Sequence, residues 1–98
     1  MKVLHVDENH PALVEGLKKL GFQNDLAYKD NLTSILAKID QYEGLIIRSR
    51  FPVDEALLLN AKKLRFIGRV GAGLENIDID AVKKHNIQLV NSPEGNRN

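Results

Sequence analysis

Residues 65–78, RFIGRVGAGLENID, decide how the whole sequence is interpreted. Residues 64–70 have the character of a β-strand, and they lead into a Gly-x-Gly turn. Asp78 then precedes residues 79–85, which have helical character, and it is a good helix cap. A strand, a glycine turn and a helix in this order are typical of an α/β unit. The same order is found where a loop binds a dinucleotide.

The glycines nevertheless do not match a dinucleotide fingerprint. That fingerprint is Gly-x-Gly-x-x-Gly, and its third glycine lets helix and strand pack closely. Here the third position is Asn76, and the motif follows the fourth predicted strand instead of the first. No acidic residue closes a strand about 20 residues further on, since Glu94 lies in the terminal loop. The alternative for Gly71 and Gly73 is a tight connection that needs positive φ.

Strand-like and helix-like segments alternate along the rest of the chain. The predicted strands are residues 2–7, 22–28, 44–48, 64–70 and 87–90, and the predicted helices are 9–20, 32–39, 54–61 and 78–85. Asn9 or His10 is expected to cap the first helix, Gly21 to follow it, and Asn31 to cap the second. Five strands alternating with four helices predict an α/β domain with a parallel sheet covered on both faces.

Composition limits the possible functions. The 98 residues suffice for one small domain, and a net charge of +1 does not indicate nucleic acid or an anionic membrane as a partner. The absence of cysteine excludes disulfides and thiolate zinc sites, and it fits a cytoplasmic location. No signal peptide is expected, because Asp7, Glu8 and Asn9 interrupt the first apolar run. The three histidines have no spacing that suggests a metal site.

The carboxyl ends of the predicted strands point to an anion site. Residues 48–69 contain six basic and two acidic residues, whereas residues 1–47 contain five basic and seven acidic ones. Ligands of open α/β sheets collect at the carboxyl ends of the strands. Arg48, Ser49 and the amides after Val70 are therefore candidates to hold a carboxylate or phosphate. The alternative for Arg48 is a solvated or paired surface charge.

Three blocks, residues 44–49, 64–78 and 87–96, resemble the D-isomer-specific 2-hydroxyacid dehydrogenases in order and spacing. The resemblance implies a flavodoxin-like, three-layer domain with a five-stranded parallel sheet in the order 2-1-3-4-5. It implies that Arg48 and Ser49 face a cleft between two domains. It also implies that the amides of Val70, Gly71 and Ala72 receive the substrate carboxylate.

The same resemblance gives two further residues a role and leaves others to a missing domain. Asn96 would lie at the hinge near the substrate, and Arg69 would contact a substrate phosphate. Residues 1–98 would be a substrate-binding domain, a fragment with no catalytic, cofactor-binding or metal-binding residue of its own. NAD would bind the absent domain, so the 98-residue chain alone is predicted to be inactive. The full protein would form a homo-oligomer.

The substrate implied is a D-2-hydroxy acid or the corresponding 2-keto acid. Arg48 and Arg69 fit a phosphorylated acid such as D-3-phosphoglycerate. Reduction of glyoxylate or hydroxypyruvate is the alternative that stays open.

Two functions of other classes are also considered. The acidic Asp7 and Glu8 after the first predicted strand resemble the start of a receiver domain, which holds magnesium there. A receiver also needs a phosphoacceptor Asp at the end of the third strand, where this sequence has Arg48. The other alternative is a non-catalytic domain that senses a small acid.

Overall fold

The computed structural model describes residues 1–70 and 76–92. The elements in chain order are β1 (Lys2–His5), α1 (Pro11–Lys19), β2 (Gln23–Leu26), α2 (Leu32–Lys38), η1 (Ile39–Gln41), β3 (Gly44–Ile47), α3 (Glu55–Asn60), β4 (Phe66–Val70), α4 (Ile79–Lys84) and β5 (Gln88–Ser92). The five strands form one parallel sheet in the order β2-β1-β3-β4-β5, which confirms the predicted topology. The last strand extends two residues beyond its predicted end.

Local sequence explains where the helices begin and end. His10 caps α1, since its Nδ1 accepts the amide of Ala12 at 3.0 Å, and Gly21 follows the helix at φ +93°. Asn31 caps α2 and Asp78 caps α4, both through side-chain oxygens. The predicted caps of these three helices are therefore confirmed, with His10 taking the role that Asn9 was also considered for.

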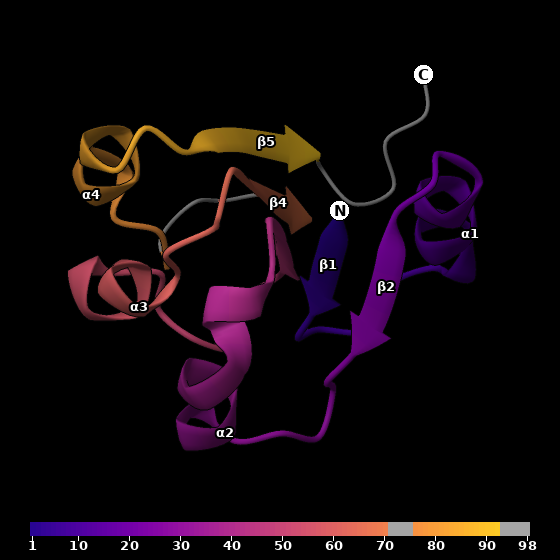
Figure 1. Ribbon diagram of the computed structural model, residues 1–98, viewed down its shortest axis with the longest axis horizontal. Helices are drawn as coiled ribbons and strands as arrows, with labels where there is room; N and C mark the ends of the chain where they lie inside the picture. The colour runs from indigo at the N-terminus through magenta and orange to yellow at the C-terminus, as the bar shows by residue number, and fades with distance from the viewer. Residues whose placement is uncertain (71–75, 93–98) are drawn as a thin grey trace.

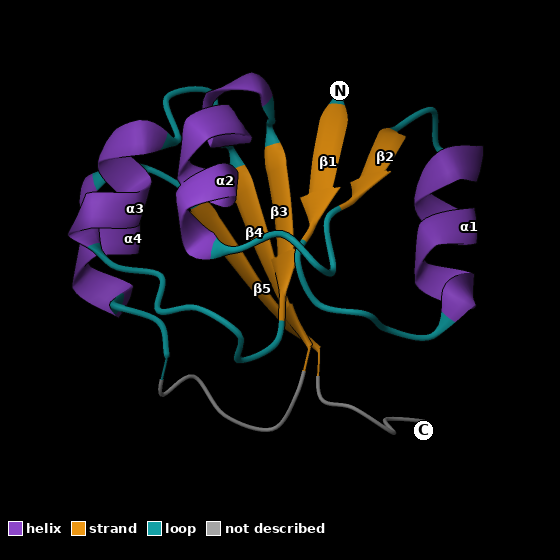
Figure 2. Ribbon diagram, turned by 90° about the horizontal axis from the view of Figure 1, so that it is seen from below, coloured by secondary structure: helices purple, strands orange, loops and turns teal. Residues whose placement is uncertain are grey.

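The helices are distributed unevenly over the two faces of the sheet (Figure 2). Right-handed crossovers place α1 on one face, because β1 to β2 runs toward one edge of the sheet. The next three connections run toward the other edge, so α2, α3 and α4 all cover the opposite face (Figures 1 and 2). Helix α1 contains no buried residue, whereas α2, α3 and α4 each bury at least one. The hydrophobic core therefore lies between the sheet and the three-helix layer.

The core is built from central strands and the inward sides of the three helices. Its fully buried side chains include Leu4, Ile35, Ile39, Leu45, Ile47, Leu58, Ile67 and Val82. Strand β3 is buried along its whole length, which explains its unbroken run of apolar residues. A rigid centre of this kind fixes the positions at which the strands end, and the loops at those ends form the candidate site.

Candidate functional site

The loop after β3 is bound to the end of β1 through one carboxylate. Oδ2 of Asp7 accepts the backbone amides of Arg48, Ser49 and Arg50 at 2.6, 3.1 and 3.2 Å. Three successive amides that converge on one oxygen form an anion-binding concavity. Asp7 is half-buried and fills it from within the chain. The conformation of residues 48–50 is thus set by a side chain 41 or more positions earlier in the sequence.

Arg50, in the loop after β3, binds in turn the backbone that follows β1 and β2. Its Nη1 donates to the carbonyls of Val6 and Ala27, each at 2.9 Å, and its Nη2 donates to the carbonyl of Asp30. These carbonyls lie beyond the ends of β1 and β2, and that of Ala27 also accepts the amide of Asp30 at 3.3 Å. The guanidinium also lies 4.8 Å from the ring centroid of Phe51. Arg50 is consequently a structural cation that joins three strand ends.

The loop after β4 is joined to the loop after β3 by Asn76. Its Oδ1 accepts Nε of Arg69 at 3.0 Å, and its Nδ2 donates to the carbonyl of Phe51 at 3.1 Å. The backbone of Asn76 accepts the amide of Val53 at 2.8 Å, and Val53 and Ile77 form a parallel bridge. The two strand-end loops are therefore held together by both backbone and side-chain contacts.

The predicted site residues fall into three groups. Arg48 and Ser49 lie directly after β3, where the first is half-buried and the second exposed. Arg69 and Val70 end the neighbouring strand β4, with Arg69 paired to Ile47 in the sheet register. The structure thus brings these four residues to one edge of the sheet. Gly71, Ala72 and Asn96 lie outside the described residues.

Arg69 is held more tightly than its predicted role requires. Its side chain is 7% exposed, its Nε is bound to Asn76, and its Nη1 donates to the carbonyl of Val70. The contact of this guanidinium with a substrate phosphate stays a prediction.

The geometry at Asn76 differs from that of a dinucleotide loop. The fingerprint requires a glycine there for close packing of a helix that begins at the turn. In this chain the side chain of Asn76 is half-buried and makes hydrogen bonds in two directions, and α4 begins only at Ile79. The residues present therefore do not fit a pyrophosphate in this loop.

The receiver alternative also lacks support at its key positions. The carboxylate of Asp7 is occupied by three amides, and a cation, Arg48, stands where the phosphoacceptor would be. Within residues 1–70 and 76–92, no cluster of three or more His, Asp or Glu side chains has the arrangement of a metal site. None of the helices in that same part of the chain is long and apolar enough to cross a membrane.

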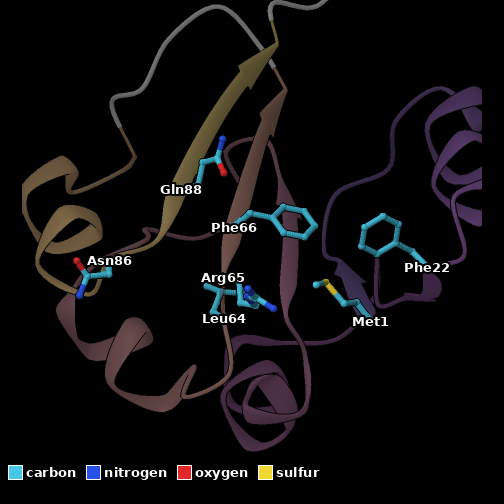
Figure 3. A pocket seen from close by; sticks show the side chains of 7 residues that line it. All are labelled: Met1, Phe22, Leu64, Arg65, Phe66, Asn86 and Gln88. Carbon is cyan, nitrogen blue, oxygen red and sulfur yellow. The ribbon is translucent and has the colours of Figure 1, made fainter.

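A hollow of about 450 Å³ lies at the opposite, amino end of the strands (Figure 3). It is lined by Met1, Phe22, Leu64, Arg65, Phe66, Asn86 and Gln88. The rings of Phe22 and Phe66 meet edge to face with centroids 6.0 Å apart. Asn86 lies on the far side of β5 from these rings, so the polar groups do not converge (Figure 3). This hollow lacks the convergent polar groups that fix a bound ligand.

Three residues that shape the site were not among the predicted site residues. Asp7, Arg50 and Asn76 bind the loop after β3 and the end of β4. From the sequence, Asp7 stands out only as a receiver-like carboxylate and Asn76 only as the third position of the glycine motif. A polar residue directly after each strand was the available signal. Their partners are backbone groups on other strands, and sequence spacing does not indicate such partners.

Comparison with known proteins agrees with this arrangement. The family model described as D-isomer specific 2-hydroxyacid dehydrogenase, catalytic domain, matches residues 3–98. A D-3-phosphoglycerate dehydrogenase of Sus scrofa is 37% identical over 97 residues, covering 97% of this chain and 18% of the relative. One of Archaeoglobus fulgidus is 32% identical over 96 residues, covering 98% of this chain and 18% of the relative. The chain thus spans less than a fifth of the length of these curated relatives.

Solved structures give the same result. An NAD⁺-bound 3-phosphoglycerate dehydrogenase of Entamoeba histolytica superposes with a TM-score of 0.75 at 29% identity, over 93% of this chain and 32% of that one. A protein of Pyrococcus horikoshii superposes with a TM-score of 0.84 at 23% identity, over 92% of this chain and 27% of that one, which supports the fold. This chain belongs to the family of D-isomer-specific 2-hydroxyacid dehydrogenases.

Proposed function

We propose that residues 1–98 form the substrate-binding part of an NAD-dependent oxidoreductase that acts on a D-2-hydroxy acid. D-3-phosphoglycerate is the first candidate substrate, which would assign the protein to serine biosynthesis. Two relatives above 30% identity carry the name D-3-phosphoglycerate dehydrogenase and cover nearly all of this chain. Arg48, directly after β3, supports an acid that carries an anionic group on this side of the site.

One observation carries this proposal. The loops after β3 and β4 are joined by the Val53–Ile77 bridge and by Asn76, so Arg48 and Ser49 lie on the same edge as the end of β4. Neighbouring strand ends of a parallel sheet are where ligands of open α/β folds bind. A planar guanidinium suits a carboxylate or a phosphate. We assign Arg48 and Ser49 to one side of the acid, and Val70, Gly71 and Ala72 to the other.

The chemistry assigned to this chain is binding and orientation. Oxidation of a 2-hydroxy acid needs a hydride acceptor and a group that takes the hydroxyl proton. NAD supplies the acceptor when it is bound, and we assign its binding and the catalytic residues to a segment outside residues 1–98. Asn96 is assigned to the hinge toward that segment. This chain would hold the acid by its anionic groups and present its C2 carbon to the cofactor.

A chimera tests the proposal. Residues 1–98 replace the matching 96 residues of the Archaeoglobus fulgidus relative, and NADH formation is followed with D-3-phosphoglycerate, D-lactate and glycolate. We expect turnover with D-3-phosphoglycerate. Arg48→Met should raise its KM by about 10- to 100-fold, because one charge-assisted contact is lost. Arg65→Met, the same change at an exposed position of the amino end, is the matched control and should leave KM unchanged.

The isolated chain gives a complementary result. The purified 98-residue protein should form no NADH above background with any of the three acids, because the cofactor and the proton-accepting group are absent. Turnover by the isolated chain would contradict the assignment of these groups to another segment. A chimera that folds, binds NAD and oxidises none of the acids would refute the proposed function.

A further inference from the structure

We infer that Asp7 and Asn76 are positioning residues that hold the loop after β3 and the end of β4 in their binding conformation before any ligand arrives. The inference rests on the proposed function, since it concerns how Arg48, Ser49 and Val70 are presented. Neither residue is needed to complete the sheet. Each instead uses a side chain to fix the backbone of a loop that follows a strand.

Asp7 acts as a built-in ligand of the β3 loop. Its Oδ2 lies within 3.2 Å of three consecutive amides, so the concavity that would attract an external anion is already filled. A substrate carboxylate or phosphate cannot use these amides while Asp7 occupies them. The contribution of this loop to binding must therefore come from the side chains of Arg48 and Ser49. Asp7 fixes the backbone from which both of these side chains project.

Asn76 performs the corresponding task between the two loops. Its amide group contacts Nε of Arg69 on β4 and the carbonyl of Phe51 in the β3 loop, at 3.0 and 3.1 Å. Asparagine suits this place because its side chain both accepts and donates a hydrogen bond. An aspartate would keep the contact with Arg69 and lose the donor to Phe51. Asn76→Asp therefore separates the hydrogen bond to Arg69 on β4 from the hydrogen bond to Phe51 in the loop after β3.

The burial of Arg69 fits the same scheme. Its side chain is 7% exposed, and two of its guanidinium nitrogens are bound to Asn76 and to the carbonyl of Val70. It therefore stabilises the end of β4. We assign it to positioning through Asn76, and we assign the charge that meets the substrate to Arg48.

Hydrogen exchange on the 98-residue chain tests the positioning directly. Asp7→Ala should speed exchange of the amides of residues 48–50 by about 10- to 100-fold, the loss expected for hydrogen bonds to a carboxylate. Core amides of β3 should keep their protection, which shows that the variant is folded. Asp7→Asn, which keeps an acceptor oxygen, should restore part of the protection. Glu8→Ala removes the same charge from an exposed neighbour and should change nothing.

The second arm uses the chimera. Asp7→Ala and Asn76→Asp should each raise KM for D-3-phosphoglycerate by about tenfold and change kcat less than twofold, because the binding groups are misplaced and the reacting groups are not. Glu8→Ala should match the unmutated chimera. Unchanged exchange, or faster exchange with unchanged KM, would overturn the positioning role in an active chimera. An unmutated chimera without activity would instead overturn the proposed function.

Discussion

The two ends of the sheet are held together by different kinds of bond. At the amino ends, neighbouring strands are joined mainly through their backbones: the amide of Glu43 donates to the carbonyl of Lys2 and its carbonyl accepts the amide of Arg65, at 2.9 and 2.7 Å. One side chain takes part there as well, since Oε1 of Glu43 accepts the amide of Lys2 at 2.7 Å. At the carboxyl ends, the carboxylate of Asp7 and the guanidinium of Arg50 bind the backbone of other segments. The amino end thus continues the sheet, whereas the carboxyl end depends on particular side chains.

This difference explains how one small fold separates stability from binding. Backbone bonds at the amino end tolerate most substitutions, because any residue supplies the amide and the carbonyl. Side-chain bonds at the carboxyl end set loop conformations that ordinary strand pairing does not set. A loop fixed in this way can carry binding groups without being part of the core. Substitutions at each end should therefore differ in their effects on stability and on amide exchange.

The largest effect is expected at the carboxyl end. Arg50→Met should lower the free energy of unfolding by about 2–3 kcal/mol, because the carbonyls of Val6, Ala27 and Asp30 lose a charged donor. Methionine retains much of the apolar stem, so little packing is lost. Urea denaturation followed by circular dichroism measures the change.

Its matched control is the same substitution at the other end of the sheet. Arg65 is exposed, and Arg65→Met should change the free energy of unfolding by less than about 0.5 kcal/mol. If the two variants were equally stable, the contrast between the ends would be wrong.

An intermediate effect is expected at the amino end, through packing. A Cβ at Gly44 would lie 2.3 Å from Cζ of Phe66, its register partner on β4. Gly44→Ala should cost about 1–3 kcal/mol, because the ring must leave the glycine and its contact with Phe22. Gly68→Ala is the control, since its nearest atom is the flexible end of Ile46 at 2.7 Å, and it should cost less.

The same variant also tests whether the ends are independent. Amides 48–50 should exchange at the same rate in Gly44→Ala as in the unmutated chain once both are compared under conditions where the protein is folded. Faster exchange confined to these amides would mean that packing at the amino end affects the conformation of the loop after β3.

The fold was predictable from sequence because its signals are local. Alternating elements, the unbroken apolar run of β3 and the caps at Asn31 and Asp78 each depend on residues close in the chain. The strand order came from the family resemblance, and the structure confirms it. The uneven cover of the two faces follows from that order and from right-handed crossovers, so it is implied by the strand order alone.

The candidate site was predictable only in its location. The edge of the sheet and the basic residues after β3 follow from general rules for α/β folds. The bonds of Asp7 and Arg50 join residues 20 to 44 positions apart, and sequence alone does not indicate which side chain meets which backbone groups. The burial of Arg69 was missed for the same reason, because its partner Asn76 follows a glycine turn whose path the sequence does not specify.

The smallest effect is a pH dependence located where β1 ends. His5 is 1% exposed and its Nε2 lies 2.8 Å from Oδ1 of Asn24, and burial lowers the pKa of His5 below its ordinary value. A proton therefore binds the unfolded chain more tightly than the folded one. The free energy of unfolding should be highest above pH of about 6.5 and should fall as pH decreases below that value toward the folded pKa.

His5→Asn should remove this part of the pH dependence, so unfolding free energies at pH of about 7.5 and 5.5 should differ less in the variant than in the unmutated chain. An equal difference in both proteins would show that folding does not lower the pKa of His5, so that the ring is protonated in the fold at pH of about 5.5. The end of β1 would then contain a buried charge that its backbone bonds do not balance.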